Sequence, residues 1–293
     1  MKILLIVLAV LLAAGMILGF VLAGFVMTGK RQTLAEALAW QKDHYDISFY
    51  DALEKENYTV ISELDGYVLH AQLLRCPEGS DRYVICSHGY TDNRIGSLKY
   101  ARFYLDLGFH VIMYDLRGHG ENEPAFTSYG IREARDLMSV IRDARERFGE
   151  DIVLGIHGES LGAATTVTAL QYRPEVAFAV ADCPFADIEN VLHLPEPVRT
   201  LTDLGAKLRF GYFLHSMRPI DALPGNQVPM LVIHGSADDF ILPSNSERIR
   251  DAAEGKAKLI LVEGAGHAES ALKDPAGYEE HLRTFLQANG ILD

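Results

Sequence analysis

The chain contains 293 residues, of which 48% are hydrophobic, and it has no internal repeat, which predicts one large core. Its formal net charge is −13, and no basic stripe could neutralise phosphates, which excludes nucleic acid as a partner. The three cysteines lack C-x-x-C spacing, so they indicate neither a disulfide framework nor a zinc site.

The N-terminal run over residues 3–29 contains no charged side chain. As a helix it is about 40 Å long, more than the roughly 30 Å hydrocarbon core of a bilayer, so we expect residues 1–29 to form a single-pass membrane anchor. A cleavable signal peptide is the alternative, but its apolar region is usually about 7 to 15 residues long, and no clear cleavage site precedes Lys30. Basic groups lie on both sides of the run, so the side of the membrane stays undecided.

The next segment, residues 30–57, carries a helix-start signal. Thr33 and Glu36 have the spacing of a capping box, and we expect a juxtamembrane helix that ends near Asn57. Such a helix would separate the rest of the chain from the lipid.

The third segment, residues 58–293, has the pattern of an α/β domain. The strand-like runs 58–61 and 67–71 flank Asp65-Gly66, which predicts an antiparallel hairpin at the start of the sheet. The remaining chain alternates apolar strands with helices, which is typical of a doubly wound, mostly parallel sheet.

A serine lies between glycines in Gly158-Glu159-Ser160-Leu161-Gly162, after an apolar run and before a helical pattern. A strand that turns sharply into a helix at this point would place the hydroxyl of Ser160 at the tip of a strained turn, the shape of a nucleophile elbow. The start of the following helix would direct free N–H groups at a nearby oxyanion.

Residues 183–228 form an insertion that is far longer than a usual strand-to-helix connection. We expect a helical cap over the active site, in which Leu201, Leu204, Leu208 and Phe213 face a pocket for an apolar acyl or alkyl group. The alternative is that these side chains only pack the cap onto the core.

An activated serine needs a base, and the base needs an acid, so both should follow at later strand ends. The apolar run 229–233 leads to Asp238 and Asp239, and the run 258–262 leads to His267 on a glycine-rich loop. The chain order of serine, acid and histidine agrees with that of α/β-hydrolases.

From Tyr58 onward the chain resembles an α/β-hydrolase of the serine-hydrolase kind. Ser87-His88-Gly89-Tyr90 is similar to the family's oxyanion loop, and residues 114–120 are similar to its Asp-x-Arg-Gly-x-Gly loop. The resemblance implies Ser160 as nucleophile, Asp238 as acid and His267 as base. It also implies that the backbone N–H groups of Tyr90 and Leu161 form the oxyanion hole.

Two positions depart from the family pattern. The segment between the acid and the next proline is one residue longer than usual, which leaves Asp239 as an alternative acid, with Asp182 a minor rival. Glu121 replaces the usual serine after Gly-His-Gly. Glu159 would either contact substrate or only solvate the elbow. Other histidines near strand ends are expected to bond or pack within their own loops: His88, His119, His157 and His234.

We therefore expect a membrane-anchored hydrolase that cleaves carboxylic esters through an acyl-enzyme intermediate. A peptidase or thioesterase on the same triad is the alternative, and a non-catalytic binding module is a further one that would be marked by a lost triad residue. No metal or nucleotide cofactor is expected, because Gly118-His119-Gly120 lacks the third glycine of a dinucleotide loop.

Overall fold

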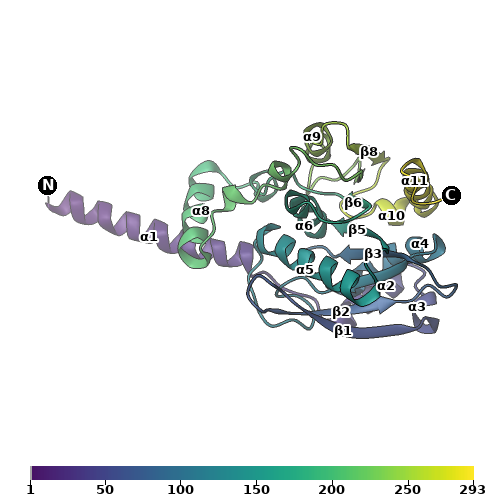
Figure 1. Ribbon diagram of the computed structural model, residues 1–293. Helices are drawn as coiled ribbons and strands as arrows, with labels where there is room; N and C mark the ends of the chain where they lie inside the picture. The colour runs from purple at the N-terminus through teal and green to yellow at the C-terminus, as the bar shows by residue number, and fades with distance from the viewer. Residues whose placement is uncertain (1) are drawn as a thin grey trace.

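The computed structural model describes residues 2–293, which form one α/β body from which the N-terminal helix projects (Figure 1). The strands are β1 (Lys55–Ile61), β2 (Val68–Leu74), β3 (Arg82–Ser87), β4 (His110–Tyr114), β5 (Val153–Glu159), β6 (Phe178–Asp182), β7 (Met230–Gly235) and β8 (Ala257–Val262). The longer helices are α1 (Lys2–Met27), α2 (Leu34–His44), α4 (Leu98–Asp106), α5 (Ile131–Phe148), α6 (Leu161–Ala169), α8 (Glu196–Phe210), α9 (Ser244–Ala252) and α11 (Pro275–Ala288). The short helices are α3 (Phe49–Ala52), α7 (Glu189–Leu192) and α10 (Ser270–Lys273).

One eight-stranded sheet has the order β1-β2-β4-β3-β5-β6-β7-β8. The predicted hairpin is confirmed, because β1 pairs antiparallel with β2, and β2 pairs antiparallel with β4. All later neighbours pair in parallel. The predicted doubly wound, mostly parallel sheet is therefore confirmed.

Helices cover both faces of this sheet, because alternate strand residues are apolar on each side. On one face, α5 and α6 pack on β-strand residues such as Ile85 and Ile156. On the other face, α4 and α11 pack on Val84 and Cys86, which flank Ile85 along β3. The carboxyl ends of the parallel strands lie on the same side of the sheet, and the loops of the candidate site gather there.

The predicted capping box is present: Thr33 Oγ1 accepts from the N–H of Glu36, and the Glu36 carboxylate accepts from the N–H of Thr33. The predicted helix through residue 56 was wrong, because α2 ends at His44 and Tyr45 is extended. The chain turns there to bury Ile47 in the core, and β1 has already begun at Lys55.

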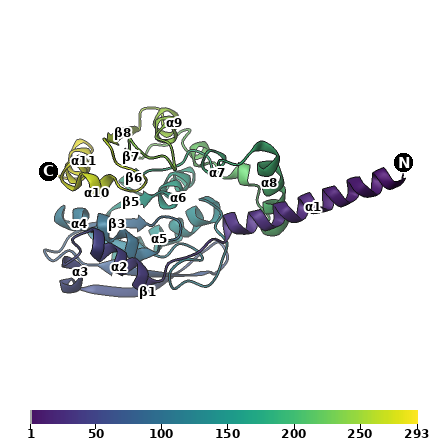
Figure 2. The ribbon, with the colours of Figure 1, turned by 180° about the vertical axis from the view of Figure 1, so that it is seen from behind.

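The segment after α1, residues 30–57, packs on the domain. It therefore does not act as a spacer between α1 and the domain. Ala37 is buried in the core, and Gln41 Nε2 donates to the carbonyl of Gly96 at 3.2 Å. Figure 2 shows α2 against the body, at the level of the sheet.

Helix α1 is the one described helix that is long and apolar enough to cross a membrane, with a mean hydropathy of 3.0. Its first half projects from the body, and its second half lies beside α8 in both views (Figures 1 and 2). A signal sequence has the same composition and position.

Candidate active site

Ser160 occupies the turn between β5 and α6 with a backbone φ of 51°, which a residue with a side chain rarely adopts. The turn is tight. A Cβ on Gly158 would lie 2.0 Å from the carbonyl oxygen of Gly162, and a Cβ on Gly162 would lie 1.9 Å from the carbonyl oxygen of Ser87. Both positions therefore need glycine, and the turn presents the serine hydroxyl at the carboxyl end of a central strand.

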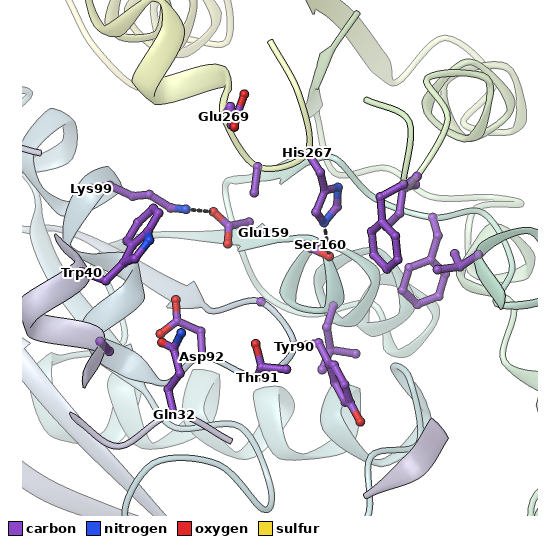
Figure 3. A pocket seen from close by; sticks show the side chains of 18 of the residues that line it. Gln32, Trp40, Tyr90, Thr91, Asp92, Lys99, Glu159, Ser160, His267 and Glu269 are labelled. Atoms are coloured by element: carbon purple, nitrogen blue, oxygen red, sulfur yellow. Dashed lines mark hydrogen bonds and ion pairs between the residues drawn. The ribbon is translucent and has the colours of Figure 1, made fainter. Parts of the chain in front are cut away.

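His267 lies on the loop after β8, and its ring points at Ser160 (Figure 3). Its Nε2 is 3.0 Å from Ser160 Oγ, and its Nδ1 is 2.8 Å from Asp238 Oδ2. The fold thus brings together the three residues that the sequence suggested. Asp239, the alternative acid, is exposed.

Asp238 is buried, and its carboxylate is fully engaged. Its Oδ1 accepts from the N–H groups of Phe240 and Ile241 at 3.0 and 2.8 Å, and its Oδ2 also lies 3.1 Å from His234 Nε2. Burial opposes ionisation, but these hydrogen bonds and those of the two histidines outweigh it and hold the Asp238 pKa well below its usual value. The carboxylate can therefore stay charged beside an imidazolium.

Tyr90, on the loop after β3, and Leu161, the first residue of α6, both line the cavity together with Ser160. In the described part of the chain, the backbone N–H groups of these two residues make no hydrogen bond to the carbonyl of a turn or loop. The Tyr90 loop is held by His88, whose Nδ1 lies 2.7 Å from the Gly89 carbonyl and whose Nε2 accepts from the N–H of Leu116. Burial lowers the His88 pKa to about 3, so its ring stays neutral.

Of the other histidines near the strand ends, His119 bonds within its own loop as expected, whereas the expectation was wrong for His157 on β5, which bonds to a residue on α4, and His234 also reaches a residue on α9. His234 lies 2.7 Å from the Ile241 carbonyl and 2.6 Å from Ser246 Oγ. His119 Nδ1 lies 2.9 Å from the Arg117 carbonyl, and His157 bonds to the hydroxyl of Tyr104 at 3.0 Å.

A cavity of about 830 Å³ opens around Ser160 and His267, within the usual size range of a small-molecule site (Figure 3). One side is polar and includes Asp92, Lys99 and Glu159. Another part of the lining is an apolar wall that consists of Phe185, Ile188, Val191 and Leu192, which follow β6.

Glu159, next to the serine, forms a buried ion pair with Lys99 on α4. Its carboxylate also accepts from the hydroxyl of Tyr100, which lies 3.1 Å from Asp182. Burial alone would lower the Lys99 pKa, but the Glu159 carboxylate raises it above its ordinary value. Burial, reinforced by repulsion from Glu159, raises the pKa of Asp92 to about 6. Glu159 therefore lines the cavity and also anchors the elbow to α4.

Glu121, which stands where the family usually has a serine after Gly-His-Gly, forms an ion pair. Its carboxylate pairs with Arg94, which also pairs with the buried Asp115, and its N–H donates to Asp115 Oδ2 at 3.0 Å. The loop is therefore closed by a guanidinium between two carboxylates.

Cys183, Asp238 and His267 offer donor atoms within 4.8 Å of one another. Burial and the nearby carboxylate of Asp182 raise the Cys183 pKa well above its usual value, which keeps the thiol protonated and opposes metal binding. The histidine and the carboxylate already bond to each other, so this set fits a hydrogen-bonded triad better than a metal centre.

The insertion is present, but the predicted orientation of its helix was wrong. Leu204 and Leu208 on α8 are exposed, and Leu201 contacts Gly15 of α1. Phe213 does not line the cavity and stacks on His215. The periodicity identified an apolar helix face, but of its leucines only Leu201 lies against another helix, α1, and none lines the cavity. The apolar wall of the cavity comes from the start of the insertion instead.

Sequence reasoning missed several residues that line the cavity far from any motif, among them Gln32, Trp40 and Lys99. Trp40 lies on α2, and its ring is 5.7 Å from the Lys99 ammonium. The one signal was that this is the single tryptophan of the chain.

Comparison with known proteins gives consistent results. The model of the prolyl oligopeptidase family matches residues 96–288. The uncharacterized protein YqkD of Bacillus subtilis is 32% identical over 98% of this chain and 97% of its own. The α/β hydrolase domain-containing protein 17C of Xenopus tropicalis is 28% identical over 86% of this chain and 75% of its own.

Solved structures share the fold. The Pyrococcus furiosus esterase Pf2001 superposes with a TM-score of 0.68 at 22% identity, covering 85% of this chain and 93% of its own. An esterase domain from Rhodothermus marinus superposes with a TM-score of 0.60 at 21% identity, covering 80% and 99%.

Proposed function

This chain belongs to the prolyl oligopeptidase family of hydrolases with the α/β-hydrolase fold, and we propose that it is a membrane-anchored serine hydrolase that cleaves carboxylic esters. The observation that carries the proposal is the continuous hydrogen-bonded chain from Ser160 through His267 to Asp238.

In the first half-reaction, Ser160 Oγ attacks the ester carbonyl carbon, and Nε2 of His267 accepts the hydroxyl proton. The carbonyl oxygen becomes an oxyanion that accepts hydrogen bonds from the N–H groups of Tyr90 and Leu161. His267 then gives the proton to the alkoxide as the carbon–oxygen bond breaks, which releases the alcohol and leaves an acyl group on Ser160.

In the second half-reaction, a water molecule gives a proton to His267 and attacks the acyl carbon. The second tetrahedral species collapses, the proton returns to Ser160, and the free acid leaves. Throughout, the Asp238 carboxylate holds Nδ1 of His267 protonated and stabilises the imidazolium that forms at each attack.

An apolar acyl group suits the wall formed by Phe185, Ile188, Val191 and Leu192. The catalytic residues, the wall and the cavity size together support a small-molecule ester or acyl substrate, with no cofactor required for the steps above.

Retention of α1 as an anchor is supported by its contacts with the domain. The hydroxyls of Tyr90 and Tyr129 both donate to the carbonyl of Val26, and the hydroxyl of Tyr90 accepts from the N–H of Gly29. Cleavage of a signal peptide near this point would remove partners from the loop next to Ser160.

A peptidase is the second candidate, favoured by the family and by the carboxylates that line the polar side of the cavity, Asp92, Glu159 and Glu269. Such a side suits a substrate that bears a positively charged amine close to the scissile bond.

The test uses the full-length chain in detergent. A fluorophosphonate probe should label the parent, and Ser160→Ala should abolish labelling and lower hydrolysis by about 10⁴ to 10⁶-fold. Labelling that persists in Ser160→Ala would refute the nucleophile, and an unlabelled parent would favour a non-catalytic module. Faster cleavage of aminoacyl p-nitroanilides than of p-nitrophenyl butyrate would identify the peptidase.

A further inference from the structure

Helices α1 and α8 are joined by a close contact between small residues. A Cβ on Gly19 would lie 2.0 Å from the carbonyl oxygen of Leu201, and a Cβ on Gly205 would lie 2.2 Å from the backbone of Gly19. Nearby, the Arg209 guanidinium donates to the carbonyl of Phe20 at 3.1 Å and lies 4.8 Å from its ring. The two backbones therefore meet directly, and α8 lies across the second half of α1 (Figures 1 and 2).

The part of α1 that is free of this contact is short. Residues 2–14 are all exposed, and the contact with α8 begins at Gly15. As a helix, residues 2–14 are about 20 Å long, whereas the hydrocarbon core of a bilayer is about 30 Å thick. A bilayer that α1 spans must therefore reach the level of α8.

The outer face of α8 has the composition that this position requires. Thr202 and Ala206 are fully buried, whereas Leu204 and Leu208 are 47% and 62% exposed. Two residues along a helix correspond to about 200° of rotation, so the leucines lie opposite the buried pair and face outward. They are four residues apart and form one apolar ridge.

Basic side chains accompany this ridge. Lys207 and Arg209 are exposed in the last turns of α8. A further apolar side chain, Phe25 of α1, is 74% exposed. An apolar ridge with flanking cations is typical of helices that lie at the boundary between acyl chains and phosphate headgroups.

We propose that α8 is an interfacial helix, with Leu204 and Leu208 inserted at the level of the upper acyl chains and its basic side chains near lipid phosphates. The inference rests on the proposed anchoring by α1 and extends it to a second membrane contact. Because α7, which lines the cavity with Val191 and Leu192, immediately precedes α8, the apolar wall of the cavity adjoins the bilayer. Acyl chains that partition into the membrane are then the substrate class within reach.

The test places one environment-sensitive NBD label at a time on the full-length chain, in vesicles of phosphatidylcholine and phosphatidylglycerol that carry doxyl lipids. The labelled sites are Val10→Cys in α1, Leu208→Cys in α8 and, as a matched control, Leu261→Cys on β8. All three leucine or valine positions are exposed, and the native cysteines are buried. The parent chain measures background labelling.

The proposal expects lipid-borne doxyl groups to quench the labels at positions 10 and 208 several-fold more than the label at 261. Quenching at 10 but not at 208 would overturn the interfacial role of α8 and leave the anchor intact. Absence of quenching at 10 would overturn the anchor and, with it, this inference.

Discussion

The hydroxyl of Tyr90 lies 2.9 Å from the backbone carbonyl of Val26, so the end of α1 is tied to the loop that carries a proposed oxyanion N–H. The Arg31 guanidinium lies 4.4 Å from the centroid of the Tyr90 ring, and the Tyr129 ring stacks on the Tyr90 ring with 5.6 Å between centroids. The N-terminal helix is thus part of the support of the candidate site as well as a candidate membrane span.

We predict that the point of truncation decides activity. Deleting residues 2–14 removes only exposed residues and should leave hydrolysis of p-nitrophenyl acetate within about twofold, because no contact with the loop is lost. Deleting residues 2–30 removes Val26 and Gly29, and the loss of three hydrogen bonds of about 1 kcal/mol each, two with Tyr90 and one with Tyr129, should lower kcat by about tenfold or more. Equal activity of the two truncated chains in detergent would contradict the coupling.

The two adjacent acids should differ sharply. Asp238→Asn removes the acceptor that fixes the tautomer of His267 and should lower kcat by about 10³ to 10⁴-fold. Asp239→Asn, at an exposed neighbour, is the matched control and should change kcat little. Steady-state kinetics with p-nitrophenyl butyrate check the ranking, and a larger loss in Asp239→Asn would reassign the acid.

The buried ion pair of Lys99 and Glu159 should make the loss of one partner more destabilising than the neutral replacement of both. Lys99→Met leaves the Glu159 carboxylate without its buried partner and should lower the free energy of unfolding by about 3 to 5 kcal/mol. The double variant Lys99→Met/Glu159→Gln should recover a large part of that loss.

The matched control is the exposed pair of Arg102 and Asp106 on the same helix, where Arg102→Met should cost no more than about 1 kcal/mol. Urea unfolding measures all three variants. A Lys99→Met value as small as that of Arg102→Met would show that Glu159 is not held as a buried charge.

Asp92 should make stability fall as the pH rises. Burial and repulsion from Glu159 raise its pKa to about 6 from 3.8, so the unfolded chain releases this proton at lower pH than the folded chain does. Stability from this group therefore declines between pH 3.8 and about 6 and stays low above that window.

Asp92→Asn does not ionise, so its stability relative to the parent should be greater at pH 8 than at pH 4. Asp46→Asn is the opposite control, because hydrogen bonds from Ser48 lower the Asp46 pKa. Thermal unfolding at the two pH values gives both differences, and a pH-independent effect of Asp92→Asn would show that this carboxyl is not perturbed.

The sequence predicted the sheet, the hairpin and the loops of the candidate site because each depends on local signals. Glycines beside Ser160 mark a turn that only they can adopt, and apolar runs ending in Asp238 or His267 mark strand ends. The partner of α8 has no such signal, since its leucine spacing describes one face of a helix and not what covers it. The end of α2 was missed for a related reason: the burial of Ile47, a tertiary contact, overrides the local helical pattern.

The apolar wall predicts a dependence on acyl chain length. Each methylene that it buries is worth about 0.8 kcal/mol, so kcat/KM should rise several-fold from p-nitrophenyl acetate to the butyrate. The larger side chain of Val191→Trp would fill the space beside this wall. It should abolish the rise of kcat/KM with chain length while acetate hydrolysis continues. Phe213→Ala, in the same insertion but outside the cavity, is the control and should keep the parent profile. If Phe213→Ala flattens the profile and Val191→Trp does not, the acyl group binds under the later part of the insertion, and the wall described here has another role.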